Sequence, residues 1–172
     1  MIIEQHQIND FTTSVKQNMI ICFGCFDLIH IGHISMFENL KNIVSTLIVA
    51  VANDEAVQKL KGVNRPIIPE EERSVMLDAV RYVDYVFIQR AGDVTTLKKK
   101  YNFNDKETII WENCMYPLSL LTPKYVAISS DFVMTPAMKR FFSDENFQII
   151  VVPYFDRQST SKIVAKILNT DA

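Results

Sequence analysis

The sequence predicts an α/β fold of the Rossmann-like type, in which a doubly wound parallel sheet forms the middle of a three-layer α/β/α sandwich. Short apolar runs alternate along the chain with amphipathic stretches of helical period, as expected when helices connect parallel strands. Several runs are apolar almost throughout, which is typical of strands buried on both faces. We expect strands at residues 20–23, 47–52, 85–88, 125–128 and 147–152.

Helices are expected between these strands, at residues 34–44, 69–83, 114–121 and 136–142, and after Ser159. Pro69 precedes three glutamates, and proline and carboxylates both suit the first turn of a helix. The buried face of that helix is expected to consist of Val75, Met76, Ala79, Val80 and Val83. Ser159 is a suitable N-cap for the last helix.

The chain shows no repeat, low-complexity segment or flexible linker, so residues 1–172 are interpreted as one domain with an N-terminal extension at 1–18. Its length suits a single hydrophobic core. Residues 101–117 fit the alternating pattern least well and are a candidate insertion. Within them, residues 108–111 are interpreted as either an extra strand or part of a looped insertion.

Composition excludes several classes of function. The formal net charge is -2, so no global basic field is available to hold a nucleic acid. The only basic run, Lys98 to Lys100, is interpreted as a solvated helix end. No apolar stretch reaches the ~18 residues of a membrane span, and the first residues lack the apolar core of a signal peptide. Three cysteines, an odd number, fit a reducing cytosol, so we expect a cytoplasmic protein.

The segment FGCFDLIHIGH follows the first expected strand and leads into the first helix. Gly24 permits close approach of the backbone to a ligand, and the N–H groups of a helix start attract phosphate. His30 and His33 lie three residues apart at that helix start. Imidazoles and backbone donors gathered there suit a reaction that builds charge on phosphate oxygens.

Other chemistries for this segment are less consistent with the sequence. Cys22 and Cys25 form a CxxC, but Cys22 falls inside the expected strand, whereas a redox pair needs an exposed first cysteine. A zinc site from His30, His33 and Cys25 would draw its ligands from one compact loop, with fewer than the four of a structural site. The chain lacks GxGxxG and has four glycines, which disfavours a nicotinamide dehydrogenase.

The segment GCFDLIHIGH resembles the Gly-x-Phe-Asp-x-x-His-x-Gly-His signature of the cytidylyltransferase-like nucleotidyltransferases. Similarity extends through residues 51–88, which are most similar to adenylyltransferases that act on heptose 1-phosphate. Archaeal-type FAD synthetases and glycerol-3-phosphate cytidylyltransferases are also similar. The ending STSKIVAKI resembles the Ser-Thr-Thr helix start of that family.

The resemblance implies a nucleotide site and an acceptor site. His30 and His33 would bind the phosphates of the nucleoside triphosphate (NTP) and stabilise the transition state, and Lys61, or alternatively Lys59, would approach from a flexible loop. The implied nucleotide-binding residues are Phe23, Gly24, Cys25, Phe26, Asp131, Ser159, Thr160 and Ser161. The implied acceptor-binding residues are Asp27, Arg65 and Arg73, and Arg73 would also help to order the site.

Most of these positions also admit a structural role. The hydroxyls of Ser159 to Ser161 suit an anion site or a plain N-cap, and Asp131 suits the nucleotide or a cap for the next helix. Asp27 is alternatively a turn residue, Lys61 and Arg65 lie in what would be a solvated loop, and Arg73 is alternatively half of a surface ion pair.

The reaction implied by the resemblance is direct in-line transfer. The phosphate of a small acceptor would attack the α-phosphorus of an NTP, with Mg²⁺ accompanying the triphosphate and pyrophosphate leaving. ATP with a sugar 1-phosphate is the first expectation, followed by ATP with FMN or CTP with a polyol phosphate. We expect a homodimer that uses no nucleic acid, membrane or protein-bound metal. A non-catalytic nucleotide-binding module is the alternative of another class.

Three departures from the family pattern concern the substrate. Residues 128–131 read ISSD where the heptose enzymes have Lys-Gly-Gly-Asp. Tyr154 replaces an arginine of the glycerol-3-phosphate enzymes, although Arg157 is near in sequence. The segment 101–117 is longer than expected and is a candidate for remodelling the acceptor pocket.

Overall fold

The structure is a computed structural model that describes residues 1–4, 7, 10, 13–153 and 159–169. Its centre is a parallel five-stranded sheet with the strand order β3-β2-β1-β4-β5. The strands are β1 (Met19–Gly24), β2 (Thr46–Val51), β3 (Tyr85–Ile88), β4 (Tyr125–Ser129) and β5 (Gln148–Val152). All five lie where the sequence predicts them, and the α/β fold class is confirmed.

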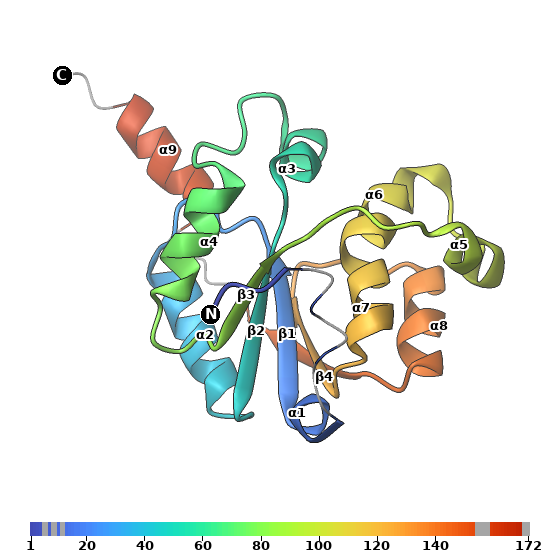
Figure 1. Cartoon of the computed structure of the whole chain (residues 1–172). Helices are drawn as coiled ribbons and strands as arrows, with labels where there is room; N and C mark the ends of the chain where they lie inside the picture. Colours follow the sequence, from blue (N-terminus) through green and yellow to red (C-terminus); the bar gives the residue numbers. More distant parts are fainter. Residues whose placement is uncertain (5–6, 8–9, 11–12, 154–158, 170–172) are drawn as a thin grey trace.

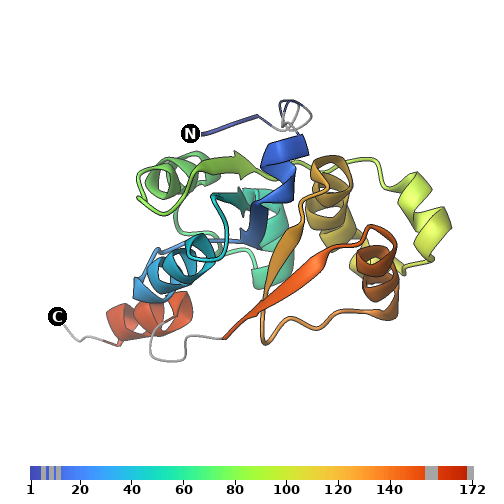
Figure 2. The same cartoon turned by 90° about the horizontal axis from the view of Figure 1, so that it is seen from below.

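Helices cover both faces of this sheet (Figures 1 and 2). One face packs against α2 (Ile31–Lys41) and α4 (Glu70–Asp78), with α9 (Thr160–Leu168) beside α2. The other face packs against α7 (Tyr116–Leu121) and α8 (Pro136–Asp144). The remaining helices are α1 (Thr13–Gln17), α3 (Asp54–Lys61) and α5 (Thr95–Tyr101), and the short turns η2 (Asp105–Glu107), α6 (Thr108–Ile110) and η3 (Trp111–Met115).

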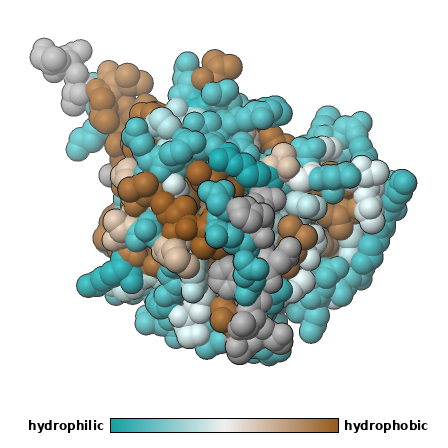
Figure 3. Space-filling model, in the orientation of Figure 1, coloured by the Kyte–Doolittle hydropathy of each residue, from teal (hydrophilic) through white to brown (hydrophobic). Residues whose placement is uncertain are grey.

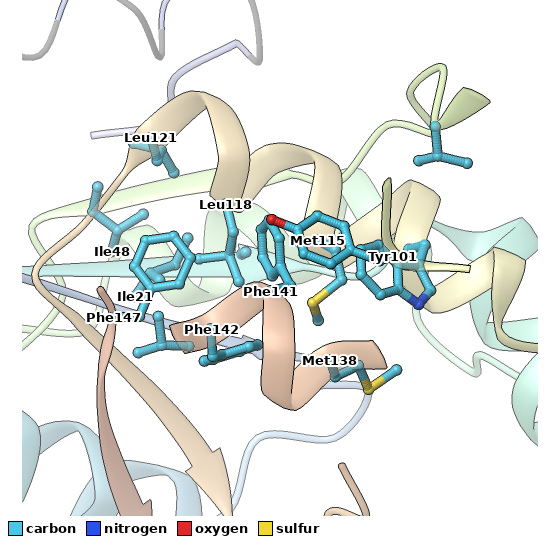
Figure 4. Close-up of a cluster of buried hydrophobic side chains, with 14 of the residues drawn as sticks. Ile21, Ile48, Tyr101, Met115, Leu118, Leu121, Met138, Phe141, Phe142 and Phe147 are labelled. Atoms are coloured by element: carbon cyan, nitrogen blue, oxygen red, sulfur yellow. The ribbon is translucent and has the colours of Figure 1, made fainter. Parts of the chain in front are cut away.

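Two hydrophobic clusters hold the three layers together. Neighbouring residues of β1 alternate between them: Ile20 and Cys22 face α2 and α4, whereas Ile21 faces α7 and α8. Figure 4 shows the cluster on the side of α7 and α8, in which Phe141, Phe142 and Phe147 pack against Ile21 and Ile48 of the strands. Burial on both faces explains why the strands are apolar almost throughout.

Residues 108–111 are helical, so their interpretation as an extra strand or looped insertion is wrong. The π-helical turn η3 follows α6 and continues into α7. Trp111 is fully buried and stacks on Phe103, with 4.2 Å between ring centroids. It also packs against Tyr101 and Phe141. Aromatic burial of this kind makes the segment part of the core rather than an appendage.

The predicted buried face is only partly buried. Val83 is buried and Val80 partly buried, but both follow the end of α4 at Asp78, and within the helix a different face is buried. Arg73, Ser74 and Leu77 are buried, whereas Val75 is 60% exposed and Met76 is 42% exposed. The reason is Arg73, whose guanidinium donates hydrogen bonds to the carbonyls of Ile68 and Ala52 in the interior. These contacts fix which face of α4 is turned inward. Apolar surface therefore lies over α4, where it is visible in Figure 3.

Helices α1 and α3 were not predicted from the sequence, and only the end of α5 was. Asn53 caps α3 by accepting from the Ala56 N–H, and acidic residues occupy its first turn. Lys98, Lys99 and Lys100 form the last turn of α5, in agreement with their interpretation as a helix end. Among the described residues, no helix combines the length and apolar character needed to cross a membrane.

Candidate active site

A cavity of about 550 Å³ opens at the carboxyl ends of the strands. The chain runs from β1 outward to β3 and then returns to the other side of β1 with β4, so the cavity lies at the point where the sheet order reverses. Ligands in doubly wound folds bind at such a point. The lining includes every predicted site residue except Arg73: Phe23, Gly24, Cys25, Phe26, Asp27, His30, His33, Lys61, Arg65, Asp131, Ser159, Thr160 and Ser161.

His30 and His33 form a stacked pair at the start of α2, with 3.9 Å between their ring centroids. The Nδ1 atom of His30 accepts a hydrogen bond from the Gly32 N–H at 3.1 Å. The Nδ1 atom of His33 accepts from the His30 N–H at 3.4 Å. A neutral imidazole that accepts at Nδ1 carries its proton on Nε2. Each ring therefore retains an Nε2–H donor for a ligand in the cavity.

Both histidines favour the neutral form. Burial lowers the pKa of His30 below its ordinary value of 6.5. The pKa of His33 falls to about 4, first through burial and then through the nearby His30 and the ammonium of Lys61. At neutral pH the pair thus offers hydrogen-bond donors, while Lys61 supplies positive charge beside them.

Gly24 ends β1 beneath the ring of Phe26. A Cβ at Gly24 would lie 2.7 Å from the Phe26 ring, closer than real side chains approach. Phe26 adopts a left-handed backbone conformation with φ 50°, and its ring packs edge-on against His33 at 5.3 Å. Glycine is required here because a side chain would displace the ring that supports His33.

One arm of the cavity is formed by β4, β5 and the start of α9. Ser159, Thr160 and Ser161 line it at the helix N-terminus, where backbone N–H groups favour an anion. Ser159 is also the N-cap, since its Oγ accepts from the Lys162 N–H at 3.2 Å. Ser159 therefore both caps α9 and lines the cavity.

Asp131 lies in the same arm and accepts a hydrogen bond from the Ser129 hydroxyl. It does not cap the next helix, because Thr135 is the N-cap of α8. Its alternative interpretation as a cap is therefore wrong. Tyr154 and Arg157, which mark another departure from the family pattern, lie outside the described residues.

The second arm lies on the β2 side and is lined by Val57, Lys61 and Arg65. Lys61 is the last residue of α3, so the expectation that it approaches from a flexible loop is wrong. Lys59 forms an exposed ion pair with Glu55 and is not part of the lining. Of the two candidate lysines, Lys61 is therefore the one that lines the cavity.

Asp27 belongs to the loop at residues 25–30 that leads to the two histidines, the histidine loop, and contacts the segment after α3. Asp27 is 4% exposed. Its carboxylate pairs with Arg65 Nη1 at 2.5 Å and accepts from the Ile67 and Ile68 N–H groups at 2.8 and 2.9 Å. Asp27 is thus not a simple turn residue, because its buried carboxylate connects the loop that carries it to residues 65–68. This ion pair keeps Arg65 partly buried, whereas residues 61–64 before it are exposed, in agreement with the interpretation of a solvated loop.

Arg73 is fully buried beneath the site and absent from the cavity lining. Its guanidinium donates to the carbonyls of Ile68 and Ala52 at 2.8 Å each, to the Cys25 carbonyl, and to Asp54 at 2.6 Å. The alternative of a surface ion pair is therefore wrong. Direct contact with an acceptor also does not fit this position, because all contacts of the guanidinium are internal.

The cysteines and the zinc alternative gain no support from the geometry. Cys22 is buried in β1, and burial raises the pKa of its thiol to about 12. All three cysteines are free thiols. Within the described part of the chain, no three His, Cys, Asp or Glu side chains form a group able to hold a metal, so His30, His33 and Cys25 do not make such a site.

Several lining residues carried no chemical signal in the sequence. They are Met36, Val57, Val152 and Pro153, whose apolar side chains contribute shape. Only the topology, which brings the ends of β1, β2 and β5 together, identifies them. Gly32, from the histidine signature, and Ser129, from the ISSD segment, also line the cavity.

Comparison with known proteins identifies the family. The Cytidylyltransferase-like family matches residues 21–166, which is most of the chain and includes every residue that lines the cavity. The chain belongs to the cytidylyltransferase-like family. The predicted family resemblance is thereby confirmed, and so is the expectation of a nucleotidyltransferase enzyme.

Curated relatives of this cytidylyltransferase-like protein include two kinds of enzyme. It is 32% identical to the FAD synthase of Thermococcus kodakarensis over 161 residues, which cover 90% of this chain and 95% of that protein. It is 31% identical to the bifunctional protein HldE of Campylobacter fetus over 151 residues, which cover 88% of this chain and 28% of HldE.

Solved structures share the fold of the cytidylyltransferase-like chain. A lipopolysaccharide core biosynthesis protein from Thermoplasma volcanium superposes with a TM-score of 0.58 at 18% identity, over 80% of this chain and 96% of that one. A pantoate-beta-alanine ligase from Francisella tularensis gives a TM-score of 0.62 at 15% identity, over 94% of this chain and 69% of that one. At these identities the likeness concerns fold alone.

Proposed function

We propose that this protein transfers the adenylyl group of ATP to the phosphate of a small acceptor and releases pyrophosphate. The observation that carries the proposal is the stacked His30–His33 pair at the start of α2, inside a cavity that a second helix N-terminus also reaches. Donors fixed in this way stabilise charge that develops on phosphate oxygens. The family match supports the reaction class.

The two arms of the cavity suit two substrates. The triphosphate occupies the arm with Ser159, Thr160 and Ser161, and the acceptor occupies the arm with Lys61 and Arg65. An oxygen of the acceptor phosphate attacks the α-phosphorus between the arms, and the bond from that phosphorus to the bridging β-phosphate oxygen breaks. The histidine Nε2–H groups donate to the oxygens of the transferring group.

Mg²⁺ enters with the triphosphate in this proposal. Magnesium keeps several waters and needs only one or two carboxylates besides phosphate oxygens. Asp131 offers one carboxylate in the triphosphate arm. Asp131 would help to hold the ion, which would neutralise part of the charge on the phosphate oxygens.

The acceptor is a phosphate monoester, with two candidates. Relatives matched over nearly their whole length are FAD synthases, which favours FMN. Residues 61–66 and the helix start at 69–73 resemble both the sugar-phosphate and the FMN adenylyltransferases, which supports ATP as the donor. A match of 43% identity over 72 residues to HldE of Koribacter versatilis, covering 42% of this chain, favours the sugar 1-phosphate of our first expectation. CTP with a polyol phosphate has less support from either observation.

A pyrophosphate-release assay tests the reaction. ATP and CTP are each supplied with FMN, a heptose 1-phosphate or glycerol 3-phosphate, and titration with non-hydrolysable ATP and CTP analogues measures base preference. The proposal expects release with ATP and one of the first two acceptors. Tight nucleotide binding with no release for any pair would instead support a non-catalytic nucleotide-binding module. We also propose that the enzyme is cytoplasmic and homodimeric.

A further inference from the structure

The carboxylate of Asp27 faces the acceptor arm but is fully engaged by the protein. Oδ1 accepts from two consecutive backbone N–H groups, those of Ile67 and Ile68, at 2.8 and 2.9 Å. Oδ2 accepts from Arg65 Nη1 at 2.5 Å. With three donors bound and little exposed surface, Asp27 is poorly suited to bind an acceptor directly.

Arg73 forms a second link between the histidine loop and the segment after α3. Arg73 donates to the Cys25 carbonyl in the histidine loop and to the Ile68 carbonyl in the segment after α3. Asp27 and Arg73 therefore both tie residues 65–68 to residues 25–27. The backbone that carries Arg65 thus has a fixed position relative to His30.

Charge in the cavity is distributed unevenly between the arms. Burial lowers the pKa of both histidines, so the pair is neutral at pH 7. Of the residues that line the described cavity, the permanently positive ones are Lys61 and Arg65, and both lie in the acceptor arm. Arg65 presents a planar fork of five donors, and Asp27 engages one of its terminal nitrogens. The remaining donors suit the oxygens of a phosphate monoester.

We propose that Asp27 is a positioning residue, which holds the guanidinium of Arg65 in place to bind the phosphate of the acceptor. This inference rests on the proposed function for the identity of the acceptor arm. It assigns Arg65 the recognition of the phosphate and leaves Asp27 without a direct contact to substrate. A lysine would not replace Arg65 fully, because an ammonium lacks the planar fork.

Binding of methyl phosphate tests the inference, because this ligand carries only the group to be recognised. The full chain is first saturated with Mg²⁺ and α,β-methylene-ATP, which fills the triphosphate arm without transfer. Methyl phosphate is then titrated by NMR into wild type, Arg65→Ala, Asp27→Asn and the double variant. Arg81→Ala removes an exposed guanidinium away from the cavity and is the matched control.

Loss of a charged hydrogen-bond donor should weaken methyl phosphate binding ~10-fold in Arg65→Ala. Asp27→Asn should weaken it similarly, and the double variant should bind no more weakly than Arg65→Ala, because Asp27 acts through Arg65. Affinity for the ATP analogue should stay unchanged in all variants. Arg65→Lys should recover only part of the loss. If Asp27→Asn does not fold, Asp27→Glu displaces the carboxylate by one methylene and carries the same expectation.

Unchanged methyl phosphate binding in Arg65→Ala would overturn the inference, as would additive losses in the double variant. Equal losses for methyl phosphate and the ATP analogue would indicate a general structural role for Asp27 and would also overturn it. The titration involves no transfer. A failure of pyrophosphate release would therefore contradict the proposed function without altering this result.

Discussion

His30 and His33 each use Nδ1 to cap the helix that carries them, which directs the remaining nitrogen of both rings to ligands. The His30 ring accepts from the Gly32 N–H, and the His33 ring accepts from the His30 N–H. Two imidazoles thus replace the usual hydroxyl and carboxylate of a capping box. The arrangement fixes the tautomers that the proposed reaction needs.

The rings of His30 and His33 should act as hydrogen-bond donors in the proposed transfer. His30→Ala and His33→Ala should each lower kcat by ~10²–10³, the usual cost of removing one preorganised donor. Far-UV circular dichroism should show a retained fold. Steady-state pyrophosphate release measures the effect, and a variant with near-wild-type kcat would show that the assigned role is wrong.

Acid sensitivity should follow from the lowered pKa of His33. Its folded value of about 4 lies below the ordinary 6.5, so between these pH values the unfolded chain binds a proton that the folded chain does not. The stabilising contribution of neutral His33 is therefore present above pH 6.5 and is lost as the pH falls toward 4. Urea unfolding at several pH values should show a smaller acid loss for His33→Gln than for wild type. Parallel pH profiles would contradict this account.

Gly24→Ala should impair activity through Phe26. The added methyl would lie within 2.7 Å of the Phe26 ring, and that ring packs against His33. Displacing it misplaces a catalytic donor, so kcat should fall more than nucleotide affinity does. Gly62→Ala is a useful comparison, because a Cβ there meets no atom within 4 Å, although its φ of 101° adds backbone strain. Equal kcat in Gly24→Ala and wild type would refute the argument.

Arg73 should matter chiefly for stability. Arg73→Met leaves three carbonyls and Asp54 without their donor, and loss of one partner from a buried ionic network costs about 3–5 kcal/mol. Arg81→Met, on the exposed segment just after α4, should change the free energy of unfolding by less than about 0.5 kcal/mol. Urea denaturation of the pair measures the contrast, and a similar small change in both variants would contradict it.

The exposed apolar face of α4 predicts where two copies meet. Val75 and Met76 lie on this face, and contiguous apolar surface commonly marks an interface. Wild type should elute as a dimer of the 19.8 kDa chain, and Val75→Glu with Met76→Glu should give monomers. Val133→Glu, at an exposed position after β4, should leave the dimer intact. Light scattering that finds monomeric wild type would overturn this prediction.

Local sequence patterns were sufficient to predict the five strands and the histidine loop. Strand burial on both faces leaves a continuous apolar signature, and FGCFDLIHIGH contains its chemistry within one loop. The face that α4 buries could not be predicted from the sequence. The apolar residues Val75 and Met76 suggested one face, but the helix buries the face that carries Arg73, whose hydrogen-bond partners lie in the interior. The helical state of residues 108–111 depends on the stacking of Trp111 on Phe103, a tertiary contact. The pairing of Asp27 with Arg65 joins positions far apart in sequence, so only the fold reveals it.

An isotope label can follow the transfer of the α-phosphorus of ATP to an acceptor. The enzyme is incubated with Mg²⁺, ATP labelled at the α-phosphorus and either FMN or a heptose 1-phosphate, and the products are separated. Adenylyl transfer should give label in an adenylylated acceptor and pyrophosphate in equal amount, and both products should be lost in His30→Ala and His33→Ala. Label that stays in ATP with every acceptor, under conditions where ATP is bound, would contradict it.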